Sequence, residues 1–326
     1  MKIVRIALVG AGYLGTIHAQ KFAHIRGAKL TAVVDSDVEK AKMLAGKHGG
    51  HAYQYCSEIN LKDIDAAIVV TTTSHHYDVA KYFLSNGVHC FIEKPITTTL
   101  EQADELIEIA RKSDCLIQVG HVERFNSAVT ALSGLVSEPR FIECDRIAPY
   151  QLRATDVSVI LDLMIHDIDL VSALFGSEVV DVQASGSAIF SPYIDVANAR
   201  LTFANGGVAN VTASRAGLKR ERVMRIFQRD SYTVLNLLEK SYTVHRKAGV
   251  NSQTGLPEVS STTEVFDACD AIMAEQDAFV RSIVDGDPVV VTGKDGRRAL
   301  SIALQIKQKV KESYAYSDGR FSSTLC

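Results

Sequence analysis

The sequence predicts an α/β protein, with a doubly wound parallel sheet in an N-terminal domain and an open, mostly antiparallel sheet in a C-terminal α+β domain. Short apolar runs alternate with amphipathic stretches in the first part of the chain, and a glycine-rich turn follows the first run. Longer, partly alternating segments replace this pattern after about residue 121. These observations favour two domains, at residues 1–120 and 121–326, in a chain longer than one core usually supports.

The apolar runs of the first domain are continuous, as expected of parallel strands that are buried on both faces. The stretches between them have helical periodicity. The clearest helix begins after Thr99, whose hydroxyl can cap it while Gln102 completes a capping box. The runs are residues 6–9, 30–34, 66–70, 90–92 and 115–119.

The second domain is expected to start with a helix near residues 156–174, followed by segments with partial alternation. The Asn-Gly-Gly at residues 205–207 lies between two apolar runs and predicts a hairpin turn, because these residues accept positive φ. Two helical patterns, at about 264–284 and 296–313, follow.

The composition argues against several classes of protein. A net charge of −3 disfavours nucleic-acid and anionic-membrane partners, which bind basic faces. No stretch approaches the roughly 18 apolar residues of a membrane span, and Arg5 interrupts the first apolar run, which makes it poor as a signal peptide. The six cysteines have no metal-ligand spacing, so we expect free thiols, a cytoplasmic protein and no metal.

A phosphate-binding turn is predicted where "VGAGYLG" follows the first apolar run and opens a helix. Gly10 permits a tight turn, Gly12 lets the backbone approach a pyrophosphate, and Gly15 lets helix and strand pack closely. Tyr13 and Leu14 complete the turn, and the helix N-terminus offers N–H groups to the phosphates. The alternative is a tight turn alone. We favour a dinucleotide-binding domain of the Rossmann type.

Asp35 favours NAD as the dinucleotide. It ends the second apolar run, twenty positions after Gly15, where a ribose-binding acid is expected. Its carboxylate would accept from the ribose hydroxyls and repel a 2′-phosphate, which makes NADP the less favoured cofactor. A helix cap is the other role for this aspartate, but Asp37 is better placed for that role.

A charged pair, Glu93 and Lys94, follows the apolar run 90–92 and precedes Pro95. Ligands of open α/β sheets bind outside the carboxyl ends of the strands, so this pair should share an edge with the glycine turn. Pro95 favours extended backbone at Lys94, which suits a lysine that orients a substrate hydroxyl. The alternative is a surface lysine at a strand exit.

A second candidate group lies in "LDLMIHDIDL", where Asp162, His166 and Asp169 can share one helical face. Histidine is a natural proton acceptor at neutral pH, and a neighbouring carboxylate would orient its ring. Two alternatives remain open: a histidine satisfied in the core, and a metal ligand whose further partners the sequence does not supply.

These motifs resemble the glucose–fructose oxidoreductase, inositol dehydrogenase and MocA family (Gfo/Idh/MocA). The resemblance covers nearly the whole chain. It implies a Rossmann domain, a second domain whose open sheet often forms an oligomer interface, and nicotinamide-dependent oxidation of a sugar or cyclitol hydroxyl. We therefore expect an enzyme that is a homodimer or homotetramer. The motifs are "VGAGYLG", "TTTSHHYDVA", "NGVHCFIEKPITTTLEQADELIEIA" and "LDLMIHDIDL".

The resemblance also implies roles for individual residues. Lys94 matches the catalytic lysine of the family, and Glu93 its neighbour near the nicotinamide ribose. Thr71, Thr72 and His76 occupy a loop that lines the cofactor in the family. That loop commonly contains Thr-Pro-Asn, whereas this chain departs from the family with three threonines at residues 71–73.

For the second domain, the resemblance implies that Asp162 orients His166, which accepts the substrate proton. The family often has glycine two residues before this histidine. Met164 replaces it here, which should reshape the floor of the pocket.

The substrate implied by the resemblance is a sugar nucleotide. "GHVERFN" (120–126) and "LDLMIHDIDL" look most like members that oxidise the 3-hydroxyl of UDP-N-acetylglucosamine to a 3-keto sugar nucleotide. Arg124, Arg146 and Arg153 could meet its diphosphate by bidentate hydrogen bonds. The alternatives are a dehydrogenase of a free sugar or inositol and a dinucleotide-sensing regulator without catalysis.

Overall fold

The computed structural model describes residues 3–22, 24–151, 157–267 and 269–318. The chain forms two compact units. The first contains Met1–Phe125 and Asp270–Leu300, and the second contains Asn126–Cys269 and Ser301–Cys326. In the described part of the chain, none of the helices has both the length and the apolar character that crossing a membrane requires.

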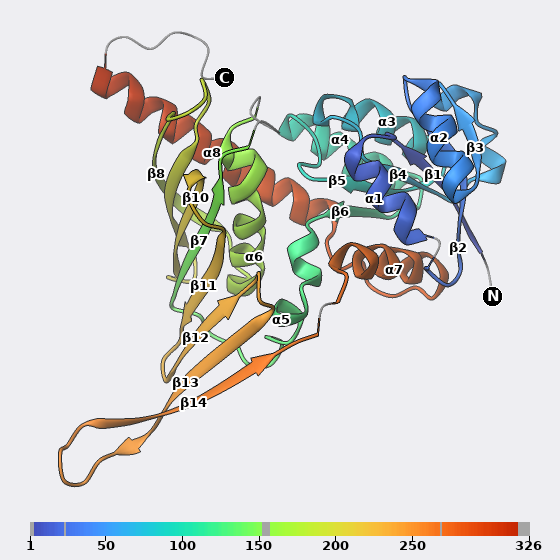
Figure 1. Cartoon of the computed structure of the whole chain (residues 1–326). Coiled ribbons are helices and arrows are strands. Elements are labelled where there is room, and N and C mark those ends of the chain that lie inside the picture. Colours follow the sequence, from blue (N-terminus) through green and yellow to red (C-terminus); the bar gives the residue numbers. More distant parts are fainter. Residues whose placement is uncertain (1–2, 23, 152–156, 268, 319–326) are drawn as a thin grey trace. The chain divides into compact units, whose positions relative to one another are not determined.

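In its described residues, the first unit has a six-stranded parallel sheet with the order β3-β2-β1-β4-β5-β6 (Figure 1). This order confirms the predicted doubly wound fold. Helix α2 packs against α1, α7 also packs against α1, and α3 packs against α4. The strands are β1 (Val4–Val9), β2 (Ala28–Val34), β3 (His51–Tyr53), β4 (Ala66–Val69), β5 (His89–Glu93) and β6 (Ile117–Gly120); the helices are α1 (Tyr13–Phe22), α2 (Val38–His48), α3 (Thr73–Ser85), α4 (Leu100–Lys112) and α7 (Ala271–Val284).

Each predicted apolar run overlaps one of these strands, whereas the short strand β3 was not predicted. The Thr99 hydroxyl accepts from the N–H of Gln102 and caps α4, as expected. The capping box is wrong in one respect: the Gln102 side chain accepts from the N–H of Thr98 instead of that of Thr99. Asp37 caps α2 by accepting from the N–H of Glu39.

In its described residues, the second unit has an eight-stranded sheet with the order β14-β13-β12-β11-β7-β10-β9-β8. Its neighbouring strands are antiparallel except for β7 and β10, which confirms the mostly antiparallel prediction. The predicted hairpin joins β9 to β10, and Gly206 adopts φ 83° in its turn. The strands are β7 (Phe141–Pro149), β8 (Val179–Ser187), β9 (Val196–Phe203), β10 (Val208–Gly217), β11 (Glu221–Phe227), β12 (Ser231–Asn236), β13 (Ser241–Val250) and β14 (Pro257–Val265).

The predicted helices of the second half need correction. The pattern from 264 was wrong at its start, because Pro257–Val265 pairs with β13 as a strand and α7 begins only at Ala271. The helix predicted near 156–174 is a π-helical turn, Ile160–Met164, followed by α6 (Ile165–Phe175). The short helix α5 is Ser127–Thr130, and the long helix α8 is Gly293–Asp318.

Two glycines fix the turn between β1 and α1. Gly10 adopts φ 106°, a conformation that other residues rarely take. A Cβ atom on Gly15 would lie 1.9 Å from the carbonyl oxygen of Gly10, so only glycine allows the helix to approach the strand this closely. This contact gives Gly15 the packing role that the sequence predicts.

Replacing Gly15 with alanine should therefore destabilise the protein by about 1–3 kcal/mol, the usual cost of overpacking. Gly46→Ala is the matched control, because Gly46 lies in α2 and an added Cβ would have no atom within 4 Å. That substitution should stabilise the protein by roughly 0.5–1 kcal/mol, since alanine favours the helix. Calorimetric melting of both variants measures the difference, and equal melting temperatures would contradict the packing role of Gly15.

Candidate active site

A hollow of about 670 Å³ lies at the carboxyl ends of β1, β2 and β4. This is the edge of a parallel sheet where ligands are expected. It is lined by Val9, Gly10, Gly12, Val34, Asp35, Ser36, Gln54, Tyr55, Cys56, Val70, Thr71, Thr72, His75 and Val79.

The glycine turn forms one wall of this hollow and suits a dinucleotide phosphate. A Cβ on Gly12 would have no atom within 4 Å, so the absence of a side chain there serves no packing purpose within the protein. Asp35 supports the turn, since its Oδ2 atom accepts from the N–H of Ala11 at 2.7 Å. Its Oδ1 atom accepts from the N–H of Asp37 at 2.9 Å. The residues present thus fit a dinucleotide, with open backbone at Gly12 and a carboxylate beside it.

The hollow brings together some of the predicted cofactor residues and leaves out others. Those that line it are Gly10, Gly12, Asp35, Thr71 and Thr72. Those that do not line it are Tyr13, Leu14, Gly15, His76, Glu93 and Lys94.

His76 is 1% exposed and ties two loops together. Its Nδ1 atom lies 2.9 Å from the carbonyl oxygen of Pro95, and its Nε2 atom lies 3.1 Å from that of Thr71. Burial lowers the pKa of His76, although its contacts with the two carbonyls oppose this shift. His76 therefore holds the loop after β4 against the Lys94–Pro95 turn.

The residues that follow β3 also line the hollow and were not predicted from the sequence. Gln54, Tyr55 and Cys56 come directly after this strand, and His75 comes from the first turn of α3. The sequence did not reveal these residues because strand β3, "HAY", is too short to be recognised as a buried apolar run. A parallel strand at this position places the residues that follow it at the same edge as Asp35.

The charged pair at the end of β5 occupies two different environments. The Glu93 side chain is buried, whereas Lys94 is half-buried, and the Lys94–Pro95 peptide is cis. The Glu93 Oε2 atom accepts from the Lys94 N–H at 3.1 Å, and its Oε1 atom lies 3.0 Å from Nε2 of His18. Burial alone would raise the pKa of Glu93, but its hydrogen bonds with the His18 ring and the Lys94 N–H and the charge of Lys94 lower the pKa.

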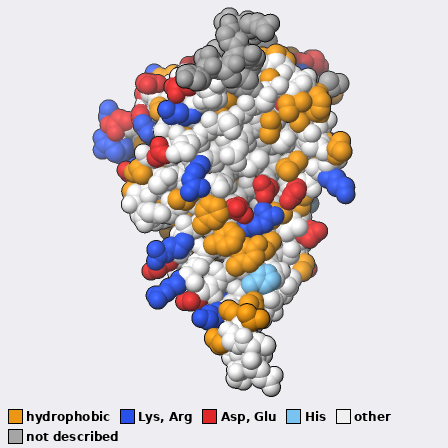
Figure 2. Space-filling model, turned by 90° about the vertical axis from the view of Figure 1, so that its left-hand side faces the viewer, with side chains coloured by type: hydrophobic (Ala, Val, Ile, Leu, Met, Phe, Trp, Pro, Cys, Tyr) orange, Lys and Arg blue, Asp and Glu red, His pale blue; other side chains and the backbone are white. Residues whose placement is uncertain are grey.

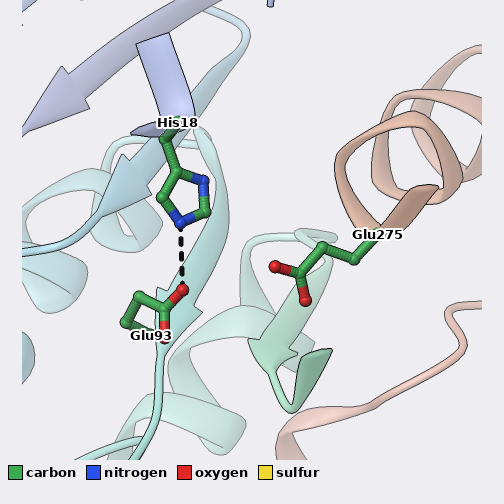
Figure 3. Close-up of side chains that lie close together, drawn as sticks. All are labelled: His18, Glu93 and Glu275. Atoms are coloured by element: carbon green, nitrogen blue, oxygen red, sulfur yellow. Dashed lines mark hydrogen bonds and ion pairs between the residues drawn. The ribbon is translucent and has the colours of Figure 1, made fainter. Parts of the chain in front are cut away.

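A second buried carboxyl group, that of Glu275 on α7, faces His18 and Glu93 (Figure 3). Among the described residues, His18, Glu93 and Glu275 form a group whose potential metal-ligand atoms lie within 4.8 Å of one another. Burial and the nearby charges of Glu93 and Asp270 raise the pKa of Glu275 well above its usual range. The group could hold either a proton or a cation between its carboxyl groups.

The predicted proton acceptor lies in the second unit, at the junction of two kinds of helix. Asp162 belongs to the π-helical turn and His166 to the first turn of α6, and both are half-buried. Asp169 is 1% exposed. A π-helical turn is rare and occurs often at functional sites, and no residue pattern predicted it here.

The three arginines expected to bind a diphosphate lie in different environments. Arg146 is 2% exposed and forms a bidentate ion pair with Asp167, at 2.6 and 2.8 Å. This placement does not favour a role in substrate binding. Arg124 is half-buried after β6, and Arg153 lies outside the described residues.

Two family matches cover most of the chain. Residues 4–121 match an oxidoreductase family with an NAD-binding Rossmann fold, and residues 132–234 match the GFO/IDH/MocA C-terminal domain. The chain belongs to the Gfo/Idh/MocA family. This confirms the resemblance inferred from the motifs.

Individual relatives within the family are named dehydrogenases. UDP-N-acetylglucosamine 3-dehydrogenase of Acidithiobacillus ferrooxidans is 38% identical over 309 residues, which are 94% of this chain and 97% of the relative. Its solved structure matches with a TM-score of 0.89 at 37% identity, covering 96% of this chain and 99% of that one. Myo-inositol 2-dehydrogenase of Thermotoga maritima is 26% identical over 328 residues, covering 95% of this chain and 97% of the relative.

Among the solved structures, a levoglucosan dehydrogenase in complex with NADH and levoglucosan matches with a TM-score of 0.84. It is 18% identical and covers 95% of this chain and 98% of that one, so it supports the fold alone.

Proposed function

We propose that the protein is an NAD-dependent dehydrogenase that oxidises the 3-hydroxyl of UDP-N-acetylglucosamine to a 3-keto sugar nucleotide. The observation that carries this proposal is the 38% identity to UDP-N-acetylglucosamine 3-dehydrogenase over 94% of the chain. The hollow at the glycine turn supports a dinucleotide, and the half-buried Lys94 follows a strand that ends at the same edge.

In this reaction the substrate carbon loses a hydride and its hydroxyl loses a proton, so that a C=O bond forms. A nicotinamide cofactor, when bound, supplies the hydride acceptor. A nitrogen of the His166 imidazole takes the hydroxyl proton, and Asp162 orients the ring. The Lys94 ammonium stabilises the negative charge that develops on the substrate oxygen. His76 and Glu93 fix the backbone on both sides of this lysine.

A second candidate is a dehydrogenase of inositol. It is favoured by the relatives named inositol dehydrogenases, among them the Thermotoga maritima protein. Such a substrate lacks a diphosphate, which agrees with the burial of Arg146 against Asp167.

The substrate is tested by incubating the protein with NAD and a panel of compounds while following the absorbance of reduced cofactor. Turnover should be fastest with UDP-N-acetylglucosamine, ahead of UDP-glucose, free N-acetylglucosamine and myo-inositol. Lys94→Ala and His166→Ala should each lower kcat about 10²-fold or more while NAD still binds. Lys112→Ala and His24→Ala, at exposed positions, are the matched controls.

Three other results would contradict the proposed substrate or the proposed catalytic roles. Turnover of inositol alone would favour the second candidate. Tight NAD binding without turnover of any compound would favour a dinucleotide-sensing protein. Lysine and histidine variants as active as the controls would refute the proposed roles of Lys94 and His166.

NAD is proposed over NADP because the Asp35 carboxylate lines the hollow. Asp35→Asn keeps an oxygen for the N–H of Ala11 but removes the charge that would repel a 2′-phosphate. The ratio of NADH to NADPH affinity should then fall by about tenfold or more, an effect of about 1.4 kcal/mol. Fluorescence titration with both reduced cofactors measures it without a substrate.

Asp37→Asn is the control for this substitution, because Asp37 caps α2 and does not line the hollow. An unchanged ratio in Asp35→Asn, or an equal change in both variants, would contradict the role of Asp35.

We also infer that the sheet of the second unit is an interface between copies of this chain. Phe141, Phe227, Tyr232 and His245 form a row of half-exposed rings across β7, β11, β12 and β13, with neighbouring centroids 4.7–5.6 Å apart. Figure 2 shows hydrophobic side chains gathered on one face, with charged side chains around them. A contiguous apolar surface of this kind is typical of association sites.

Phe227→Glu should lower the oligomer mass measured by light scattering after size-exclusion chromatography, because it places a charge within the row of rings. Met43→Glu is the control, since Met43 is 70% exposed on α2 of the first unit. A wild-type monomer, or an unchanged mass in Phe227→Glu, would contradict the interface.

The cytoplasm is the proposed compartment. The five cysteines that the structure describes are free thiols, as a reducing compartment favours.

A further inference from the structure

The buried group of His18, Glu93 and Glu275 has hydrogen-bond donors whose positions follow from the contact between Gln276 and His18. Gln276 directs its Nε2 atom at Nδ1 of His18, and the same amide nitrogen also lies 3.4 Å from the His18 carbonyl oxygen. Since an amide N–H donates, Nδ1 is the acceptor and the proton of a neutral imidazole is on Nε2. That proton is donated to the Glu93 Oε1 atom, 3.0 Å away.

Glu93 is thereby supplied with a donor at each oxygen, the His18 ring at Oε1 and the Lys94 N–H at Oε2. This is the environment of an ionised carboxylate. Space confines it as well, because a Cβ on Gly120 would lie 2.8 Å from the carboxyl carbon of Glu93. The orientation of Glu93, and with it that of the Lys94 backbone, depends on His18.

Glu275 has the opposite environment. It is 0% exposed, and among the described residues neither of its oxygens has a hydrogen-bond donor. Among the described residues, the carboxylates of Glu93 and Asp270 raise its pKa, the ring of His18 lies close to it, and Asp270 is paired with Lys21. The 3-10 turn Val122–Phe125, which carries Glu123 and Arg124, also packs against α7. A second ionised carboxylate here would be buried beside like charges, without donors.

We propose that Glu275 is a protonated carboxylic acid at neutral pH beside the ionised Glu93, and that His18 is a positioning residue which fixes Glu93 and the backbone of Lys94. The role of His18 rests on the proposed function, because it acts through the lysine assigned to catalysis. A proton is favoured over a divalent cation, because the His18 Nε2 atom uses its position toward Glu93 to donate a hydrogen bond and offers no lone pair to a metal.

The protonation of Glu275 is tested first by infrared spectroscopy of the wild-type protein in heavy water near neutral pH. A carboxylic-acid C=O band is expected, and it should be lost in Glu275→Gln but kept in Glu258→Gln, which alters an exposed glutamate. The wild-type measurement stands even if Glu275→Gln fails to fold. Absence of the band from the wild type would overturn the proposal.

Stability against pH provides a second test. A carboxyl group with a higher pKa in the folded state stabilises the fold below its unfolded pKa, and this contribution is lost as the pH rises. The folding constant of Glu275→Gln relative to wild type, from urea unfolding, should thus grow about tenfold per pH unit between the unfolded pKa of about 4.3 and the higher pKa of the folded state. A constant ratio, or a stoichiometric divalent cation in the wild type that Glu275→Gln loses, would overturn the proposal.

The role of His18 is tested by turnover. His18→Phe removes the donor to Glu93 and should lower kcat about tenfold or more, with a new acidic limb in the pH profile of kcat as Glu93 becomes protonated. His18→Gln, which retains an N–H donor, should restore part of kcat and remove this limb. A wild-type kcat and pH profile in His18→Phe would overturn the positioning role. A wild-type protein with no dehydrogenase activity would refute the proposed function, while the infrared and stability results would still decide the state of Glu275.

Discussion

The hydrogen-bond register of the parallel sheet is the constraint on which the rest of the first unit depends. Val9 is paired with Val34 on one side and Val69 on the other, and Val69 is paired with Ile92. The next residues along each chain segment therefore emerge at one edge: the glycine turn after β1, Asp35 after β2, the threonine loop after β4 and Lys94 after β5. A dinucleotide-binding edge follows from this alignment, because parallel strands end together.

The same alignment is accompanied by a buried carboxylate, that of Glu93 at the end of β5. Glu93 is the last residue of β5 and is paired with Gly120 of β6, so its side chain lies inside the unit. Such a charge is tolerated only where donors surround it, and His18 from α1 and the Lys94 N–H supply them. In the second unit, Arg146 of β7 forms a bidentate ion pair with the buried Asp167 of α6. In each unit a buried carboxylate, Glu93 or Asp167, thus has a hydrogen-bond donor at both of its oxygens.

Local patterns predicted much of this structure. The continuous apolar runs located five of the strands, the Asn-Gly-Gly located a hairpin, and Asp37 caps α2 as its position suggested. Two features were not predicted. Strand β14 has an exposed, polar sequence and forms only because β13 offers it an edge, and the π-helical turn before His166 breaks the helical periodicity without any residue that marks it. For β14, pairing with a neighbouring strand overrode local preference.

The sequence by itself determined the glycine turn, the acid after β2, the charged end of β5 and the membership of the family, because each is encoded by neighbouring residues or by motif spacing. Only the tertiary structure decided that α7 returns to the first unit and brings Gln276 to His18, 258 positions earlier in the chain. Periodicity tells which face of a helix is buried but not which partner buries it. For that reason no pattern in the sequence placed Glu275 beside Glu93, although the nearby Glu93 charge, together with burial, raises the pKa of Glu275.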